Sequence, residues 1–178
     1  MTETVAAVVV AAGRGERAGT SIPKQYRLIG GEPMIRATLR AFLRHPRIDF
    51  VQPVINLDDR DSYQRAISGL KNLLPPVAGG TTRQASVRAG LEALALHSPR
   101  LVLIHDAARP FVSAELIDRA IGAGRNCGAA VPGMALADTV KAINDSAIVI
   151  ETLDRSRLRS VQTPQAFTFN LILEAHRR

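Results

Sequence analysis

The residues from Val8 to Lys24 have the composition of a loop that holds phosphate groups. This segment reads VVVAAGRGERAGTSIPK, so an apolar run leads into small residues and then into the cations Arg14, Arg17 and Lys24. Small residues let a ligand approach main-chain N–H groups, which bind anionic oxygens. An arginine binds such oxygens in a forked contact, and a lysine supplies a compact charge. The combination favours phosphate binding or phosphoryl-type transfer, which one such cation typically accelerates by about 10³ to 10⁵.

Two glycine motifs compete as explanations of this loop. Gly13, Gly15 and Ala18 have the spacing of a loose dinucleotide-binding fingerprint. That fingerprint requires a helix at the turn and an acid about twenty residues later at a strand end. Residues 19–23 disfavour a long helix, and Glu32 lies in another turn between glycines and a proline. A P-loop is excluded, because no Gly-Lys-Ser/Thr follows the glycines at the required spacing.

A second group of candidates follows a predicted buried strand. Asp106 is the acid best placed to hold Mg²⁺, which prefers oxygen ligands and keeps several waters; the alternative is a loop cap that bonds nearby N–H groups. Arg109 could bind a second phosphate or pair with Asp106. His105 is interpreted as a packed or surface histidine, because no second His or Cys lies at ligand spacing.

Further polar groups could recognise the rest of a nucleotide or its acceptor. The Ser86 hydroxyl and the backbone of Gly79 and Gly80 could bind the edge of a base. Hydroxyl and cationic groups suited to a polyol phosphate occur late in the chain, on Thr139, Lys141, Arg155 and Thr163.

Composition narrows the class of protein. A chain of 178 residues, 46% of them hydrophobic, is long enough for one sizeable core, so we expect a single domain over residues 1–178. Cys127 is the only cysteine, which excludes an intrachain disulfide and suits the cytoplasm. The apolar run that ends at Gly13 is shorter than the ~20 residues of a membrane span. We therefore expect a soluble protein with no membrane partner.

The net charge of +7 raises nucleic acid as a partner, but the distribution of charge argues against it. Arg36, Arg40 and Arg44 lie one helical turn apart, which is typical of a solvated helix face. Tryptophan is absent and aromatic residues make up 4% of the chain, so no stacking platform for bases is visible. We predict that the chain does not bind nucleic acid.

The elements that must position these residues alternate between strands and helices. Apolar runs predict strands over 5–10, 50–55, 101–104 and, as a short central strand, 129–131. Pro53 places the second of these at an edge or at a strand start. Apolar spacing and capping residues predict helices over 34–45, 58–70, from the capping box of Thr81 and Gln84 to residue 94, over 113–121 and from 168.

This alternation predicts an α/β fold with a doubly wound, mainly parallel sheet. Ligands bind such sheets beyond the carboxyl ends of the strands. The loops 13–24, 79–86 and 105–110 all follow strands directly, so right-handed crossovers place them on one rim. The predicted phosphate loop, base loop and acidic turn should therefore converge.

The segment 138–161 differs in texture from the rest of the chain. Apolar residues surround the turn formers Asn144, Asp145 and Ser146, which predicts a β-hairpin that leaves the sheet. An isolated hairpin is marginally stable, so we expect it to pack on a second copy of the chain as a dimerisation arm. The helix that begins at Thr168 has no visible terminator, so we expect the natural polypeptide to continue.

Seven blocks of sequence, taken in order, resemble the 2-C-methyl-D-erythritol 4-phosphate cytidylyltransferase family. They are AAGRGER, PKQY, AGGTTRQASV, HDAARP, ADTVK, LDR and QTPQ. The resemblance implies a Rossmann-like nucleotidyltransferase fold and a homodimer. It also implies Mg²⁺-dependent transfer of CMP from CTP to 2-C-methyl-D-erythritol 4-phosphate, with release of pyrophosphate, in non-mevalonate isoprenoid synthesis.

The resemblance also implies a role for each matching residue. Arg17 and Lys24 would stabilise the pentavalent phosphorus, and Arg155, reaching in from the partner's hairpin, would position the attacking phosphate. The nucleotide would contact Ala11, Ala12, Gly13, Arg14 and Gly15, with the cytidine pocket formed by Gly80, Thr81 and Ser86. The sugar-phosphate pocket would be lined by Asp106, Arg109, Thr139 and Thr163, with Asp106 as metal ligand.

The chain departs from the family pattern at three places. Val10 replaces a common proline, Thr81 replaces a common acid, and the family's C-terminal segment is missing after Arg178. The form of the loop with Val10 and Arg17 resembles members fused to a cyclodiphosphate synthase. Two alternatives stay open, which are a nucleotidyltransferase for another sugar phosphate or alcohol and a nucleotide-binding module without catalysis.

Overall fold

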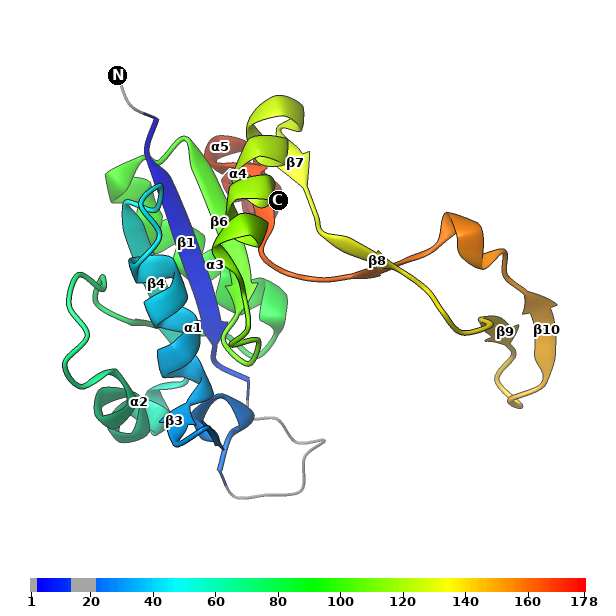
Figure 1. Cartoon of the computed structure of the whole chain (residues 1–178), viewed down its shortest axis with the longest axis horizontal. Helices are drawn as coiled ribbons and strands as arrows, with labels where there is room; N and C mark the ends of the chain where they lie inside the picture. Colours follow the sequence, from blue (N-terminus) through cyan, green and yellow to red (C-terminus); the bar gives the residue numbers. More distant parts are fainter. Residues whose placement is uncertain (1–2, 14–21) are drawn as a thin grey trace.

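A computed structural model of the protein describes residues 3–13 and 22–178. Its centre is a six-stranded sheet with the order β5-β4-β1-β6-β12-β7 (Figure 1). Strands β5, β4, β1 and β6 are mutually parallel, whereas β12 is antiparallel to both of its neighbours. The strands are β1 (Val5–Ala11), β4 (Phe50–Ile55), β5 (Val77–Ala78), β6 (Leu101–Asp106), β7 (Ala129–Ala130) and β12 (Gln165–Thr168). The predicted mainly parallel sheet is confirmed.

Helices cover both faces of the sheet, because the central strands are apolar on both sides. Side chains of β1 alternate between two buried clusters: Val5, Ala7 and Val9 join one, and Ala6 and Val8 join the other. The first cluster includes residues of α1 (Met34–Leu43), α2 (Arg60–Ile67) and α4 (Ala114–Cys127), and the second includes residues of α3 (Arg83–Leu94) and α5 (Phe169–Arg177). Short 3₁₀ helices lie at η2 (Lys24–Tyr26), η3 (Leu57–Asp59), η4 (Ala95–His97) and η5 (Arg155–Arg157). The fold is therefore doubly wound, as the sequence predicts.

The predicted edge position of the strand that contains Pro53 is wrong, because β4 lies inside the sheet between β5 and β1. The carbonyls of Val51 and Ile55 accept bonds from the β5 side of the strand. Residues two apart point the same way, so the nitrogen of Pro53, which has no proton, also faces that side. On that side β5 pairs only with Val54 and Ile55, so no partner requires an N–H from Pro53. The buried Gln52 amide donates to the carbonyls of Pro53 and Pro75.

Two further predictions need correction. The strand at residues 129–130 is at the edge of the sheet and not central, since it pairs only with β12. β12 itself has no counterpart among the predicted strands. The cap of α3 is Thr82 and not Thr81, because the Thr82 side chain accepts the bond from the N–H of Ala85.

The predicted hairpin is present and forms part of a longer arm that extends away from the sheet (Figure 1). Its base pairs β8 (Gly133–Ala135) with β11 (Arg159–Val161), and its tip pairs β9 (Lys141–Ile143) with β10 (Val149–Thr152). A separate small hairpin of β2 (Leu28–Ile29) and β3 (Glu32–Pro33) precedes α1. Among the described residues, no helix has the length and apolar character that crossing a membrane requires.

Candidate functional site

The register of the parallel strands brings the predicted loops to one edge of the sheet. Ala11 lies opposite Ile55, Ile55 lies opposite Ala78, and Val10 lies opposite Asp106. The ends of β1, β5 and β6 are therefore level, and the segments that follow them share one rim. The sequence predicts this convergence, and the described parts of the three loops agree with it, whereas residues 14–21 of the first loop lie outside the described residues. Parallel sheets bind ligands at this edge.

The turn from Asp106 to Arg109 is held by bonds from three elements. The Arg109 N–H donates to the Asp106 carbonyl at 3.0 Å, and the Ala107 N–H donates to the Val10 carbonyl at 2.9 Å. From α1, the buried Thr38 hydroxyl donates to the Ala107 carbonyl at 2.9 Å. The backbone of this turn is thus fixed before any ligand arrives, which favours a site that must hold its groups in place.

Two arginines converge on the Asp106 carboxylate. Arg83 Nε lies 2.9 Å from one carboxylate oxygen, and Arg109 Nε lies 3.3 Å from the other. Arg109 also donates to the side-chain carbonyl of Gln162. All three charged side chains are partly exposed, so the cluster is accessible from solvent. The predicted pairing of Arg109 with Asp106 is therefore observed, and Arg83 from the first turn of α3 joins them.

His105 lies beneath this turn and is buried, with 1% of its surface exposed. Its Nε2 is 3.0 Å from the Arg109 carbonyl oxygen, and its Nδ1 is 2.9 Å from Thr163 Oγ1. Its ring meets Phe42 edge to face at a centroid distance of 5.1 Å. Burial lowers the pKa of His105 to about 4, so the ring is neutral at neutral pH. The sequence predicts a packed or a surface histidine, and the structure shows that His105 is packed.

The candidate cytidine loop is held by its own side chains. Ser86 is buried, and its Oγ donates to the Thr82 carbonyl at 2.9 Å and accepts from the Gly80 N–H at 3.2 Å. A Cβ on Gly79 would overlap the Cβ of Ala12, so this loop and the end of β1 approach each other closely. The Ser86 hydroxyl therefore shapes the loop, and the exposed Thr81 is left at its surface.

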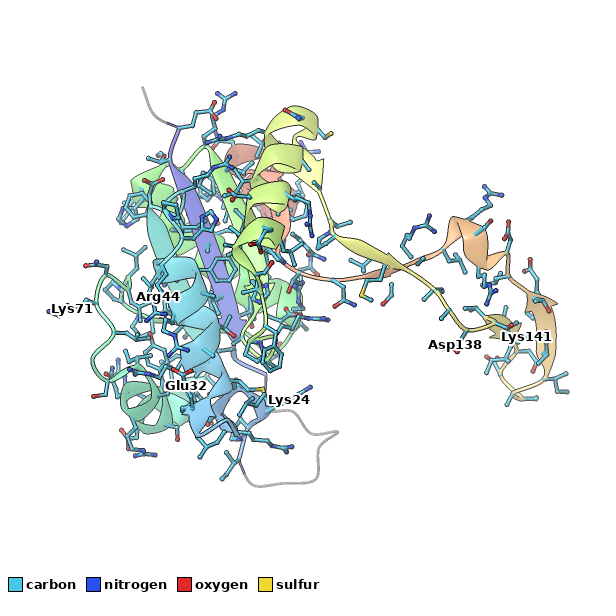
Figure 2. All side chains as sticks on the ribbon, viewed as in Figure 1. Lys24, Glu32, Arg44, Lys71, Asp138 and Lys141 are labelled. Carbon is cyan, nitrogen blue, oxygen red and sulfur yellow. The ribbon has the colours of Figure 1, made fainter. Side chains whose placement is uncertain are left out.

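Lys24 reaches the same edge through a neighbour that the sequence prediction does not include. The buried Gln25 amide donates to the carbonyl of Ala11 at 2.7 Å and to that of Gly13 at 3.1 Å. This ties η2 to the end of β1 and leaves the Lys24 side chain exposed there (Figure 2). The predicted residues Arg14, Gly15 and Arg17 lie outside the described residues.

Two of the predicted site residues lie on the arm, away from this edge. Thr139 and Arg155 are exposed, and Arg155 donates to the Ala137 carbonyl within the arm. Figure 2 shows Asp138 and Lys141 at the far end of the arm, well separated from Lys24. Thr163, by contrast, is buried in the domain, and its Oγ1 lies 3.5 Å from the Asp106 nitrogen. One chain alone does not bring Arg155 or Thr139 to Lys24.

The donor set limits how a metal could be held. Among residues 3–13 and 22–178, no group of three His, Cys, Asp or Glu side chains could bind a metal ion. Asp106 is partly exposed, and each of its carboxylate oxygens contacts one arginine, which leaves lone pairs available. Mg²⁺ commonly binds one or two carboxylates and takes its other ligands from water and phosphate. Asp106 therefore fits a magnesium that is bound mainly by a nucleotide.

Sequence reasoning missed three supporting residues, namely Gln25, Thr38 and Arg83. Each forms at least one bond with a residue distant in sequence, at separations from 12 to 69. A polar residue inside a predicted apolar stripe, such as Thr38 between Ile35 and Phe42, was the one available signal.

The sheet order, the loops at its carboxyl edge and the cations around Asp106 define a domain with the nucleotidyltransferase fold. The family model for IspD, 2-C-methyl-D-erythritol 4-phosphate cytidylyltransferase, matches residues 5–178. The chain belongs to this family.

Individual relatives agree with this assignment. The chain is 57% identical over 176 residues to the bifunctional enzyme IspD/IspF of Bradyrhizobium diazoefficiens, which covers 99% of the chain and 44% of that relative. The chain thus spans less than half the length of the curated relatives that it matches.

Solved structures show the same fold. The 4-diphosphocytidyl-2C-methyl-D-erythritol synthase of Anaerococcus prevotii superposes with a TM-score of 0.86 at 34% identity, covering 99% of this chain and 74% of that one. The 2-C-methyl-D-erythritol 4-phosphate cytidylyltransferase of Thermus thermophilus gives a TM-score of 0.73 at 34% identity, covering 99% and 75%.

Proposed function

We propose that this chain transfers CMP from CTP to 2-C-methyl-D-erythritol 4-phosphate and releases pyrophosphate. The observation that carries the proposal is that the carboxyl ends of β1, β5 and β6 are aligned in the sheet. This alignment brings together the segments that contain Lys24, Ser86 and Asp106. Membership of the cytidylyltransferase family supports the choice of substrates.

The reaction needs an oxygen of the acceptor phosphate to attack the α-phosphorus of CTP. A new P–O bond forms, the bond between the α-phosphorus and its bridging oxygen breaks, and pyrophosphate leaves with the electron pair. Catalysis of such a displacement rests on positioning and on cations that offset the phosphate charge. Lys24 and Arg17 would stabilise the α-phosphorus, and the backbone of residues 11–15 would hold the triphosphate.

The acceptor would bind on the β6 side of the edge. Arg83 and Arg109 are two cations around one acid, so the cluster carries a net positive charge that suits an incoming phosphate. Asp106 would also hold Mg²⁺, which when bound neutralises charge on the triphosphate. Gly80, Thr81 and the loop shaped by Ser86 would contact the cytosine.

The arm would complete the site of a second copy in a homodimer. Exposed apolar side chains occur along the arm from its base to its tip, and an arm extended from its domain needs a surface to cover them. Apolar residues that are at least half exposed occur there at Met134, Ile143, Ile148, Val149, Ile150 and Val161. Arg155 and Thr139 would then reach the acceptor phosphate in the partner's site. We also propose a cytoplasmic location and no nucleic-acid partner.

A coupled assay for pyrophosphate tests the proposal. The chain is mixed with CTP, Mg²⁺ and either 2-C-methyl-D-erythritol 4-phosphate or another sugar phosphate or polyol phosphate. We expect release only with CTP and the methylerythritol phosphate together. Release with a different acceptor would make the chain another sugar-phosphate nucleotidyltransferase, and no release with any acceptor would indicate a binding module.

A further inference from the structure

His105 forms a buried bridge between two segments that are 58 residues apart. One nitrogen contacts the Arg109 carbonyl at 3.0 Å, and the other contacts the Thr163 hydroxyl at 2.9 Å. The ring lies in the face of the sheet covered by α1, against Phe42. A buried imidazole with both nitrogens paired is costly to replace, because each lost partner leaves a buried polar group unsatisfied.

The partners of His105 fix where its proton lies. A backbone carbonyl can only accept a hydrogen bond, so Nε2 carries the N–H that donates to Arg109. The Thr163 oxygen accepts from the Asp106 N–H, so its own proton is free to bond His105 Nδ1, which acts as the acceptor. The Thr163 proton is therefore directed toward His105. Its oxygen keeps only lone pairs for other partners, of which the Asp106 N–H at 3.5 Å is one.

Gln162 and Thr163 connect the turn from Asp106 to Arg109 with the base of the arm. Gln162 and Thr163 lie where the arm returns to the domain, and the Gln162 N–H donates to the Pro132 carbonyl at 2.8 Å. The Gln162 side chain accepts from Arg109, and the Thr163 hydroxyl bonds His105. The orientation of the Arg109 turn thus depends on contacts from β6 and from the segment that precedes β12.

We propose that His105 is a positioning residue of the acceptor site, and that Thr163 acts on the acceptor through His105 and the Arg109 backbone. The inference rests on the proposed function, since the acceptor is the phosphate ester that Arg109 would bind. Only 7% of the Thr163 surface is exposed, which suits a residue that supports the site from beneath. Thr163 would therefore set the orientation of Arg109 without donating to a phosphate oxygen.

Steady-state kinetics of four variants test this arrangement. Thr163→Val keeps the shape of the side chain and removes the hydroxyl, and Thr163→Ser keeps the hydroxyl. His105→Phe replaces the imidazole by a phenyl ring that has no nitrogens. The fourth variant combines His105→Phe with Thr163→Val. We expect Thr163→Val to raise the KM for the acceptor about 5- to 100-fold, the range for one unsatisfied buried partner. His105→Phe leaves two partners unsatisfied, so it should raise this KM at least as much. The KM for CTP should stay within about twofold, and Thr163→Ser should restore most of the loss.

Non-additivity separates indirect action from direct contact. If Thr163 acts through His105, the double variant should be no worse than the more impaired single variant. Effects that multiply in the double variant would place Thr163 in direct contact with the acceptor and overturn the proposal. An equal rise of both KM values would also overturn it, because that result indicates a general loss of structure.

Nitrogen-15 NMR of the wild-type chain gives a readout that does not depend on activity. The proposal predicts that His105 is protonated at Nε2 and bare at Nδ1. A His105 ring that is protonated at Nδ1 would overturn the proposed arrangement, even in a fully active chain. Conversely, an Nε2-protonated ring in a chain that releases no pyrophosphate would refute the proposed function and leave the His105 bridge intact. If His105→Phe fails to fold, the two Thr163 variants and the NMR result still decide.

Discussion

Substituting Gly79 by alanine should damage the nucleotide site through packing alone. A Cβ at this position would overlap the Cβ of Ala12 and lie 2.9 Å from Ser86 Oγ. The Ser86 hydroxyl is held by bonds to Gly80 and Thr82, so it cannot turn away without losing them. The added methyl group must therefore push the loop that contains Gly80 away from the end of β1.

The size of the effect follows from the cost of overpacking. Inserting a methyl group into a packed contact costs about 1 to 3 kcal/mol. If the displaced loop binds CTP, the KM for CTP should rise about tenfold, since about 1.4 kcal/mol corresponds to a factor of ten. Combining Gly79→Ala with Ala12→Gly removes the Cβ that is overlapped. We expect this double variant to recover most of the loss, although the contact with Ser86 stays.

The assay measures the KM for CTP by pyrophosphate release and the free energy of unfolding by urea denaturation. Gly122→Ala is the matched control, because nothing lies within 4 Å of a Cβ built on this glycine of α4. That change should increase stability by about 0.5 to 1 kcal/mol through helix propensity. A Gly79→Ala variant with unchanged CTP kinetics, or one that Ala12→Gly does not improve, would refute the close approach of the two loops.

Three further predictions address charge, assembly and pH. Arg17→Ala should lower kcat by about 10³ or more and change CTP affinity much less, because the charge it meets develops in the transition state; unchanged turnover would remove Arg17 from the mechanism. Mixing equal amounts of inactive Lys24→Ala and Arg155→Ala chains should restore about a quarter of the wild-type activity, since half of the sites lie in mixed dimers and half of those are intact. No recovery would mean that Arg155 does not act across the dimer. Burial raises the pKa of Tyr63 to about 12, so the folded chain keeps a proton that the unfolded chain releases above about pH 10. Stability should therefore fall between about pH 10 and 12, and Tyr63→Phe should show a smaller fall in denaturation midpoint over that interval.

Local sequence patterns predict most of the elements around the site. The continuous apolar run at Val5–Ala11 specifies a strand buried on both faces, and it is the central parallel strand of the sheet. The helix on Ile35, Leu39 and Phe42 and the cap at Ser113 are also where their spacing and chemistry place them. Residues close together in the sequence encode these features, so they can be predicted without knowledge of the tertiary contacts.

Features that depend on distant partners could not be predicted in this way. The four residues of β12 form a strand because they pair with β6 and β7, and no local pattern selects those partners. Thr81 and Thr82 are equally good caps by type, and the path of the loop decides in favour of Thr82. Arg83 meets Asp106 only because α3 and β6 converge at the same edge.

The most direct test of the account follows the phosphorus atoms of CTP. The chain is incubated with 2-C-methyl-D-erythritol 4-phosphate, Mg²⁺ and CTP labelled either at the α-phosphate or at the γ-phosphate. We predict that the α-label enters the acceptor product and that the γ-label leaves as pyrophosphate, because the bond beyond the α-phosphorus breaks. An α-label recovered in CDP, or a γ-label transferred to the acceptor, would contradict cytidylyl transfer at this edge of the sheet.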